Sequence, residues 1–304
     1  MLGRVAKSTG SWYEIWLEDG RKLDARLRGK MRLQGKELTN PVAVGDWVEL
    51  EIDSEDLGII SKVCQRTNYI IRKATKLKSR FHIVASNIDQ AFILVSLKSP
   101  RTSTGFIDRF LVACESFDIK AGIVFNKIDL LEEHELEELD YLIDAYESIG
   151  YQTFKTSLVT GVLDPNLQAT LTNMTTLFFG HSGVGKSSLL NIILPESNQK
   201  VNAVSEAHQK GKHTTTFAQM FKGKGLEIID IPGIKEFGLD QIEPWKISHY
   251  FPEMRRVLST CKYNTCLHES EPKCGVINAV ENGVIKLFRY ENYLRILNSE
   301  EFNF

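Results

Sequence analysis

One nine-residue stretch, Gly180-His181-Ser182-Gly183-Val184-Gly185-Lys186-Ser187-Ser188, constrains the fold of this chain more than any other. The apolar run Leu177–Phe179 comes directly before it and predicts a buried strand, and Ser188–Ile193 predicts the start of a helix. Glycines allow the backbone to turn sharply between two such elements. The stretch therefore predicts a strand, a tight loop and a helix in immediate succession, as in α/β proteins.

The same stretch fits the phosphate-binding pattern G-x-x-x-x-G-K-[ST]. Backbone N–H groups in such a loop point at a phosphate chain, and the N-terminal end of the following helix favours the anion. Lys186 supplies a cation for the β- and γ-phosphates, and Ser187 a hydroxyl for Mg²⁺. We expect all nine residues to bind a nucleotide and Lys186 to take part in catalysis as well.

Length and composition indicate a globular protein with more than one domain. The chain has 304 residues, of which 42% are hydrophobic and 25% charged, and this length suffices for two or three domains. It contains no apolar run of membrane-spanning length, and its N-terminus lacks the apolar core of a signal peptide. We expect a cytoplasmic monomer that makes no contact with a membrane.

The first 72 residues predict a small β-barrel. Three of their apolar segments, Trp12–Leu17, Val42–Leu50 and Ile59–Val63, predict strands, with glycine-containing turns between such segments. This pattern suits an oligonucleotide-binding fold, which binds single-stranded nucleic acid. The basic residues on or beside one strand and loop are Arg26, Arg28, Lys30 and Arg32. We expect this surface to contact RNA, and a solvated charged face is the alternative.

From residue 73 to residue 241 the pattern changes to alternating strands and helices, which predicts a mostly parallel sheet covered on both faces. The expected strands are Gln90–Leu97, Ile123–Phe125, Tyr151–Lys155, Leu177–Phe179, Phe217–Phe221 and Leu226–Ile229. Apolar residues at helical spacing predict helices over Phe106–Phe117 and Leu136–Tyr146. We expect this region to form a nucleotide-binding domain.

Asn126-Lys127-Ile128-Asp129 follows the strand Ile123–Phe125, at the sheet edge where α/β proteins bind ligands. The Asp129 carboxylate can accept hydrogen bonds from N1–H and the 2-amino group of guanine. Adenine has neither donor and would leave the carboxylate unpaired. Asn126 would hold neighbouring loops, the Lys127 stem would cover the base, and Ser157 after the next strand could supply a backbone N–H. A plain turn is the alternative.

Two later segments resemble the switches of GTPases. Gly211–Thr216 is polar and led by glycine, and we favour Thr215 over Thr214 as a further hydroxyl for Mg²⁺. The strand Leu226–Ile229 ends in Asp230-Ile231-Pro232-Gly233. Asp230 would hold Mg²⁺ through water, and the Gly233 N–H would bind the γ-phosphate.

The last segment, residues 242–304, carries a metal-ligand pattern. Cys261, Cys266, His268 and Cys274 give the spacing C-x₄-C-x-H-x₅-C. Three thiolates and one imidazole fill the tetrahedral shell of one Zn²⁺ without an open position, so we expect a structural site. Unrelated free thiols are the alternative.

The order of these motifs is unusual, because the base-reading segment precedes the phosphate loop and both switches follow it. Together with Arg28-Gly29-Lys30 and Pro41–Asp46, these motifs make the chain similar to the circularly permuted GTPases of the RsgA/YjeQ type, which depend on the small ribosomal subunit. The resemblance implies a barrel over residues 1–72, a permuted GTPase domain over 73–241 and a zinc-binding α domain over 242–304. It further implies rRNA binding, late maturation of the small subunit, and hydrolysis of GTP stimulated by that subunit.

The motifs do not identify the residue that orients the attacking water. Many GTPases place a glutamine after Asp-x-x-Gly to orient the attacking water, but Ile234 stands here. His213, beside the threonine switch, is our candidate for this role, and an exposed turn histidine is the alternative. Two other functions remain open: an ATP-using P-loop enzyme, which Asp129 disfavours, and an RNA-binding module gated by nucleotide without useful turnover.

Overall fold

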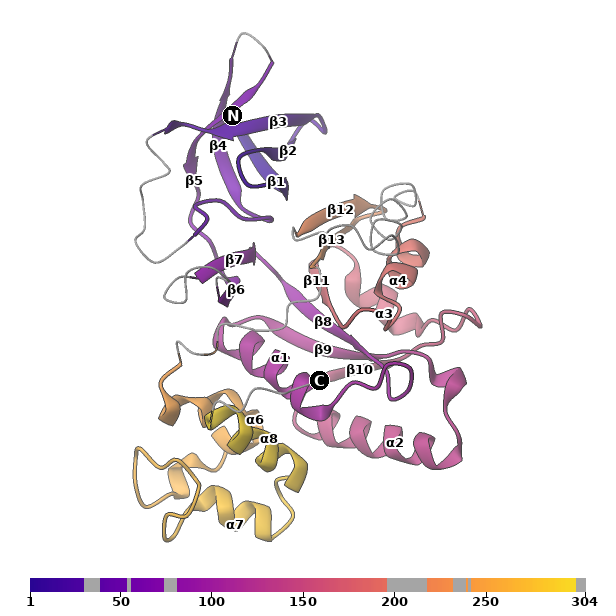
Figure 1. The fold of residues 1–304 in the computed structure, drawn as a ribbon, viewed down its shortest axis with the longest axis vertical. Coiled ribbons are helices and arrows are strands. Elements are labelled where there is room, and N and C mark those ends of the chain that lie inside the picture. Colours follow the sequence, from indigo (N-terminus) through magenta and orange to yellow (C-terminus); the bar gives the residue numbers. More distant parts are fainter. Residues whose placement is uncertain are drawn as a thin grey trace. The chain divides into compact units, whose positions relative to one another are not determined.

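The computed structural model of the chain describes residues 1–29, 39–53, 56–73, 81–195, 218–231, 239 and 242–298. The chain folds as two compact units, Met1–Phe92 with Asp164–Gly238, and Ile93–Leu163 with Leu239–Phe304. Each unit therefore combines two stretches that are far apart in the sequence (Figure 1). None of the described helices is long and apolar enough to cross a membrane.

A closed five-stranded barrel opens the first unit, as the sequence predicts (Figure 1). Its strands pair in the order β1-β2-β3-β5-β4, and a further pairing of β1 with β4 closes the ring. Side chains such as Val5, Ile15, Val48 and Ile60 are fully buried inside it. The strands are β1 (Leu2–Ser8), β2 (Tyr13–Leu17), β3 (Lys22–Leu27), β4 (Trp47–Ile52) and β5 (Gly58–Val63).

The strand expected over Val42–Leu50 begins later, at Trp47. Gly45 has φ +90°, a conformation that glycine adopts at low cost, and a Cβ there would lie 2.1 Å from the carbonyl oxygen of Ser86. The buried carboxylate of Asp46 accepts the Ala43 N–H at 2.8 Å. These contacts form a turn ahead of β4, which apolar spacing alone does not reveal. A hairpin of β6 (Tyr69–Lys73) and β7 (Phe81–Ser86) lies farther along the chain.

The second part of the first unit carries the phosphate loop. Its elements are α3 (Pro165–Leu171), β11 (Thr175–Phe179), α4 (Lys186–Ile193), β12 (Gln219–Gly223) and β13 (Leu226–Asp230). β11 pairs in parallel with β13, and β12 forms an antiparallel hairpin with β13. β12 also pairs with β1 of the barrel, with Lys7 opposite Gln219. The barrel and this part of the chain therefore share one continuous sheet.

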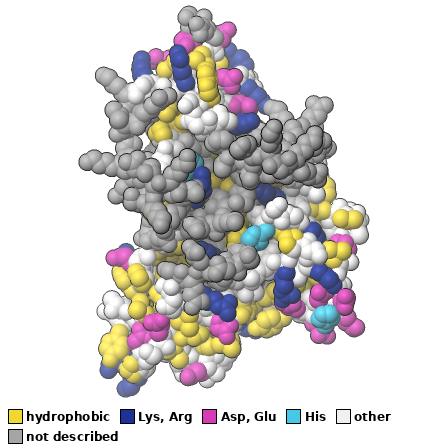
Figure 2. All heavy atoms as spheres, in the orientation of Figure 1, with side chains coloured by type: hydrophobic (Ala, Val, Ile, Leu, Met, Phe, Trp, Pro, Cys, Tyr) yellow, Lys and Arg dark blue, Asp and Glu magenta, His cyan; other side chains and the backbone are white. Residues whose placement is uncertain are grey.

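The second unit begins with an α/β segment. The boundary between the two units falls within strand β8 (Gln90–Val95), after Phe92. β9 (Lys120–Phe125) pairs in parallel with β10 (Gln152–Lys155), flanked by α1 (Thr104–Ser116) and α2 (Glu133–Ser148). α2 carries the acidic run that follows residue 131, but basic residues from other segments pair with it, as Lys98 Nζ does with Glu135 at 3.0 Å. Figure 2 accordingly shows acidic and basic side chains side by side at the lower right, where Figure 1 places α2.

Short helices complete the second unit, and α8 packs on α1. Arg289 on α8 is almost completely buried and pairs with Asp108 of α1 and Glu253 of α6, both buried. Its described elements include the 3-10 segments Ile128–Leu130, Pro244–Tyr250 and Leu258–Thr260, and the helices α6 (Pro252–Arg255), α7 (Gly275–Glu281) and α8 (Leu287–Leu297).

Candidate nucleotide and metal sites

The phosphate loop lies between β11 and α4, as its sequence predicts. Gly183 and Gly185 have φ values of +84° and +101°, which L side chains rarely adopt, so these two positions need glycine. Gly185 caps α4, and its carbonyl accepts the Leu189 N–H at 2.9 Å. Ser182 and Ser188 are exposed and Ser187 is half-buried, so the loop is open to a ligand.

Lys186 and Asp230 come together in the first unit. Phe178 of β11 lies opposite Asp230 of β13 in the parallel register, so the loop after β11 and the end of β13 share one sheet edge. Lys186 Nζ lies 2.6 Å from Asp230 Oδ1, and the ammonium also donates to the carbonyl oxygen of Ile231. Their side chains are only 12% and 18% exposed, so this pair is largely shielded from water.

His181 is the second residue of the phosphate loop and is half-buried. Burial lowers the pKa of its imidazole below the ordinary value. The ring is therefore neutral at physiological pH and adds no positive charge to the loop. Lys186 remains the formal cation that the loop offers to an anion.

The second unit holds the expected base-reading segment at the end of β9. Asn126 is buried, its side-chain oxygen accepts the Thr156 hydroxyl at 3.1 Å, and its N–H donates to the Val95 carbonyl at 2.8 Å. Lys127 has φ +64°, and its ammonium donates to the Ser99 carbonyl. Asn126 thus contacts the ends of two neighbouring strands, at Val95 and Thr156, and its role toward a bound base stays a prediction.

Asp129 and Ser157 are also brought together, although 28 positions separate them. The Ser157 hydroxyl donates to Asp129 Oδ1, and the Thr160 hydroxyl donates to Ser157 Oγ at 2.7 Å. The Ser157 N–H, which we expected to be available to a guanine oxygen, already donates to the Val162 carbonyl at 2.8 Å, and the Val162 N–H donates back to the Ser157 carbonyl at 2.9 Å. Thr160 was not among the predicted site residues, and its only sequence signal is its place in a polar turn shortly after Ser157.

Several predicted residues lie outside the part of the chain that the structure describes. They are His213 and Thr215 of the first switch, Gly233 of the second switch, and Lys30 and Arg32 of the barrel. Their roles stay predictions.

The four expected metal ligands form one cluster in the second unit. One ligand atom from each of Cys261, Cys266, His268 and Cys274 lies within 4.8 Å of all the others. His268 Nδ1 is 3.3 Å from the Cys274 sulfur and 3.7 Å from the Cys261 sulfur. Tetrahedral zinc–thiolate bonds place neighbouring sulfurs about 3.8 Å apart. The cluster is therefore compatible with zinc in both its donor set and its size.

Backbone N–H groups around the cluster favour thiolates. The N–H of Gly275 donates to the Cys261 sulfur at 3.3 Å, and that of Ile277 to the Cys274 sulfur at 3.4 Å, at the start of α7. Burial raises the pKa of Cys266 to about 12, so in the absence of a cation this thiol would stay protonated. A bound metal reverses that preference, because only the thiolate coordinates it.

Hydrogen bonds from side chains outside the metal-ligand cluster hold the backbone around His268 in place. The Glu271 carboxylate accepts the N–H groups of Leu267, Glu269 and Ser270 at 2.6, 2.8 and 3.1 Å. Burial alone would raise the pKa of Glu271, but these N–H groups lower it to about 2. The hydroxyls of Tyr290 and Tyr293 donate to the carbonyls of His268 and Leu267, both at 2.6 Å. The sequence does not single out these three side chains, because a cysteine spacing identifies only the ligands.

Three features define the class of this protein as a P-loop nucleotide-binding protein with an α/β fold. They are the glycine-rich phosphate loop, the acidic residue at the end of the neighbouring parallel strand, and the N-terminal barrel. A family model described as RsgA GTPase matches residues 63–240, and one described as RsgA N-terminal domain matches residues 2–60. The chain belongs to the RsgA GTPase family.

Similar proteins span nearly the whole chain. A small ribosomal subunit biogenesis GTPase RsgA from Christiangramia forsetii is 45% identical over 100% of this chain and 98% of its own. The protein named RsgA 2 from Bacteroides thetaiotaomicron is 46% identical over 99% and 97%. The crystal structure of YjeQ from Thermotoga maritima has a TM-score of 0.77 at 34% identity, covering 100% and 99%. The structure of YloQ, titled a circularly permuted GTPase, has a TM-score of 0.73 at 30% identity, covering 98% and 94%. The permuted motif order predicted for this chain agrees with that description.

Proposed function

We propose that this chain is a GTPase that binds the small ribosomal subunit and assists its late maturation, hydrolysing GTP to GDP and phosphate with stimulation by the subunit. The observation that carries the proposal is the contact of Lys186 with Asp230 beside the phosphate loop. It gives an arrangement suited to a triphosphate and its metal in a chain whose relatives are named for biogenesis of the small subunit.

The segment after β9 would recognise the guanine base. Asp129 would accept the two guanine donors, Asn126 would hold the loops, and Lys127 would cover the base, while Ser157 keeps the Asp129 carboxylate in place. That hydroxyl already donates to Asp129 Oδ1, which orients the carboxylate before a base arrives and lowers the cost of ordering it on binding.

The first unit, with the two switch segments at residues 211–216 and 230–233, would bind the phosphates and Mg²⁺. Residues 180–188 would surround the phosphates, with Lys186 as their cation. Ser187, Thr215 and Asp230 would serve the Mg²⁺ ion, which neutralises charge that develops on the transferred phosphoryl group. Gly233 would donate its N–H to the γ-phosphate, and His213 would orient the attacking water.

One Zn²⁺ in the Cys261/Cys266/His268/Cys274 cluster would serve a structural role, because all four tetrahedral positions are filled by side chains. We further propose that the chain works as a cytoplasmic monomer without a membrane partner. Its functional division would be a barrel over residues 1–72 that binds rRNA, a GTPase domain over 73–241 and a zinc-binding domain over 242–304.

Hydrolysis measured with and without purified small ribosomal subunits tests the proposal. We expect slow intrinsic release of phosphate from GTP and a rise of at least ten-fold when subunits are added, with large subunits as the control. A chain that binds subunits in a nucleotide-dependent way but hydrolyses GTP no faster in their presence would be a binding module instead.

Nucleotide choice is tested by competition. Unlabelled GTP and GDP should displace a fluorescent GDP analogue at far lower concentrations than ATP and ADP. Equal displacement by the adenine nucleotides would remove the base-reading role of Asp129 and favour an ATP-using enzyme.

A further inference from the structure

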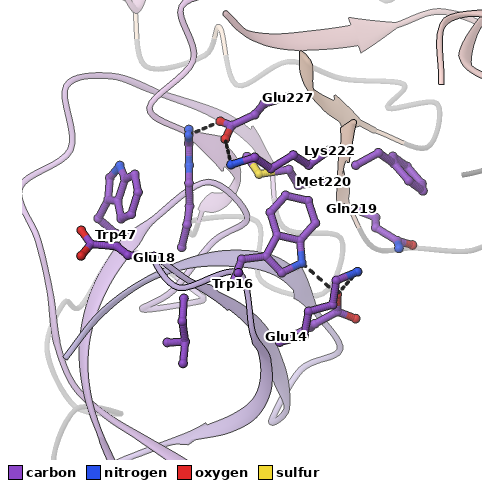
Figure 3. Close-up of a pocket in the computed structure, with 13 residues that line it drawn as sticks. Glu14, Trp16, Glu18, Trp47, Gln219, Met220, Lys222 and Glu227 are labelled. Carbon is purple, nitrogen blue, oxygen red and sulfur yellow. Dashed lines mark hydrogen bonds and ion pairs between the residues drawn. The ribbon is translucent and has the colours of Figure 1, made fainter. Parts of the chain in front are cut away.

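A cavity of about 340 Å³ opens in the first unit between the outer face of the barrel and the β12–β13 hairpin (Figure 3). Its volume lies within the usual range for ligand pockets, about 300–1,000 Å³. The barrel supplies two tryptophans, Trp16 and Trp47, and the hairpin supplies Met220, Lys222 and Glu227. The proposed nucleotide site does not use any of these residues.

The barrel side of the cavity is a row of side chains across adjacent strands. In the register of the barrel, Arg4 of β1 lies opposite both Trp16 of β2 and Trp47 of β4, and Trp16 lies opposite Lys22 of β3. The alternate positions on these strands face the barrel core, so this row faces outward. The Arg4 guanidinium lies 5.2 Å from the ring centre of Trp47, and the Lys22 ammonium 5.5 Å from that of Trp16.

Arg4 is fixed in the middle of this row. Its guanidinium donates to Glu227 of β13, to the Thr175 hydroxyl at 3.0 Å and to the Asn87 carbonyl at 3.1 Å. These bonds hold the barrel strand against β11 and β13. The Arg4–Trp47 pair is therefore a rigid wall of the cavity.

Trp16 is held in a different way. Its indole Nε1–H donates to Glu14 at 3.1 Å, which sets the ring orientation, while its side chain is only half-buried. Figure 3 shows the ring of Trp16 facing Met220 and Lys222 of the hairpin. A fixed, half-exposed indole is a surface on which a flat ring can stack at little entropic cost.

Charges at the rim define the polar part of a ligand. The side chains of Lys22 and Lys222 are 54% and 62% exposed, and each ammonium also pairs with a carboxylate of the lining, Lys22 with Glu14 at 3.9 Å and Lys222 with Glu227 at 3.1 Å. Glu14 lies beside Trp16, whose indole donates to it, and Figure 3 shows Glu18 beside Trp47. The lining carries three basic residues, Arg4, Lys22 and Lys222, and three acidic ones, Glu14, Glu18 and Glu227. Such a balanced lining favours a ligand with both negative and hydrogen-donating groups over a simple polyanion.

We propose that this cavity binds one unpaired base of single-stranded RNA, stacked on Trp16, with the adjoining phosphates beside Lys22 and Lys222. This inference rests on the proposed function and extends the RNA surface from the barrel to the β12–β13 hairpin. Base–aromatic stacking is the usual means by which proteins hold single strands. The Glu14 carboxylate beside Trp16 can accept an exocyclic amine, so the cavity prefers a base that carries one, adenine, cytosine or guanine, to uracil, which does not.

Fluorescence anisotropy with labelled six-nucleotide RNAs tests the stacking contact on the full chain. We expect A₆ to bind more tightly than U₆, and Trp16→Ala to weaken A₆ at least about five-fold, as expected for loss of one stacked base. Trp16→Phe should recover most of the affinity. Trp12→Ala is the matched control, because Trp12 is 52% exposed and does not line the cavity. Unchanged A₆ affinity in Trp16→Ala would overturn the proposal.

The hairpin supplies an independent test. Lys222→Gln should weaken A₆ and reduce the slope of log affinity against log salt by about 0.7, as for one single-strand phosphate contact. Lys224→Gln, in the turn of the same hairpin, should leave both unchanged. If Lys222→Gln binds like wild type while Trp16→Ala does not, the base lies on the barrel alone and the proposed cavity is wrong.

A third measurement separates this inference from the proposed function. In a Trp12→Phe/Trp245→Phe background, only the two cavity tryptophans emit, and A₆ should quench them. Subunit-stimulated GTP hydrolysis is measured on the same proteins. Stimulated hydrolysis without quenching would refute the cavity proposal and leave the GTPase intact, whereas quenching without stimulated hydrolysis would refute the proposed function alone.

Discussion

Lys186 Nζ lies 2.6 Å from Asp230 Oδ1, so the cation of the phosphate loop and the carboxylate at the end of β13 contact each other directly. Both belong to the machinery proposed for GTP, Lys186 for the phosphates and Asp230 for Mg²⁺. A bound Mg²⁺–GTP would offer each of them a partner of opposite charge, a phosphate for Lys186 and the metal for Asp230.

Lys186→Ala should therefore weaken both GTP and GDP. Loss of hydrogen bonds from a charged group costs about 1.5–3 kcal/mol, which corresponds to a roughly 10- to 150-fold rise in Kd. Titration with a fluorescent GDP analogue measures it. Lys224→Ala, which lies in the hairpin turn, is the control. Retention of wild-type affinity in Lys186→Ala would show that the ammonium serves only to pair with Asp230.

Asp129→Asn should change base preference. The amide loses the second acceptor that guanine needs, but its NH₂ can donate to xanthine, which has a carbonyl where guanine has an amine. We expect GTP to bind at least ten-fold more weakly and xanthosine triphosphate to bind more tightly than in wild type. Competition titrations with the two nucleotides measure the exchange, and wild-type affinity for GTP would contradict the assigned role.

Cys266→Ser should remove the metal from the second unit while sparing the nucleotide site. Structural zinc contributes roughly 10 kcal/mol or more to small domains, so we expect a lower Tm and local unfolding on chelation. Zinc content per chain and thermal melts provide the readouts. Cys64→Ser is the matched control, because Cys64 lies outside the cluster. The same zinc content in Cys266→Ser and wild type would refute the ligand assignment.

His82 should make stability fall in mild acid. Burial and, second, the charge of Arg72 lower the pKa of His82 to about 4, against an ordinary value of about 6.5. The unfolded chain therefore binds a proton that the folded chain does not, and stability is lost as the pH falls from about 6.5 to about 4. Urea midpoints at pH 7 and pH 5 should converge in His82→Gln relative to wild type. His134→Gln, at an exposed histidine of α2, should show the wild-type pH dependence.

Local motifs predicted the phosphate loop, the base-reading segment and the metal ligands, because each needs particular residues within a few positions of one another. Asp129 and Ser157 could be paired in advance, since parallel neighbouring strands end at one edge of a sheet. The barrel could also be inferred, from short apolar strands and glycine turns. The start of β4 could not, because the turn at Gly45 depends on a close approach to the Ser86 carbonyl.

Ion pairs between residues far apart in the sequence could not be predicted, because they depend on the folded chain. Arg4 is one basic residue near the N-terminus, and only the folded sheet brings it to Glu227, 223 positions away. Asp108 lies in α1, which has a strong apolar pattern, and an aspartate in such a helix would normally be predicted to lie on the solvent-exposed face. Its burial depends on Arg289, 181 positions later. The strand register that aligns Trp16, Arg4 and Trp47 likewise follows from closure of the barrel and not from spacing.

Arg289→Ala should be the most destabilising single change in the second unit. Arg289 is 1% exposed and pairs with Asp108 and Glu253, while Asn292 donates to Asp108 Oδ2 at 2.6 Å. Removing the cation leaves two buried carboxylates without their counter-charge, at a cost of about 3–5 kcal/mol. Arg295→Ala on the same helix is the matched control, because Arg295 is exposed. Chemical unfolding of the zinc-loaded chain should show the large loss for Arg289→Ala and less than about 0.5 kcal/mol for Arg295→Ala. Because α8 packs on α1, the loss should extend to the transition of the whole unit, and a Tm equal to that of Arg295→Ala would show that the two carboxylates find other partners or take up protons.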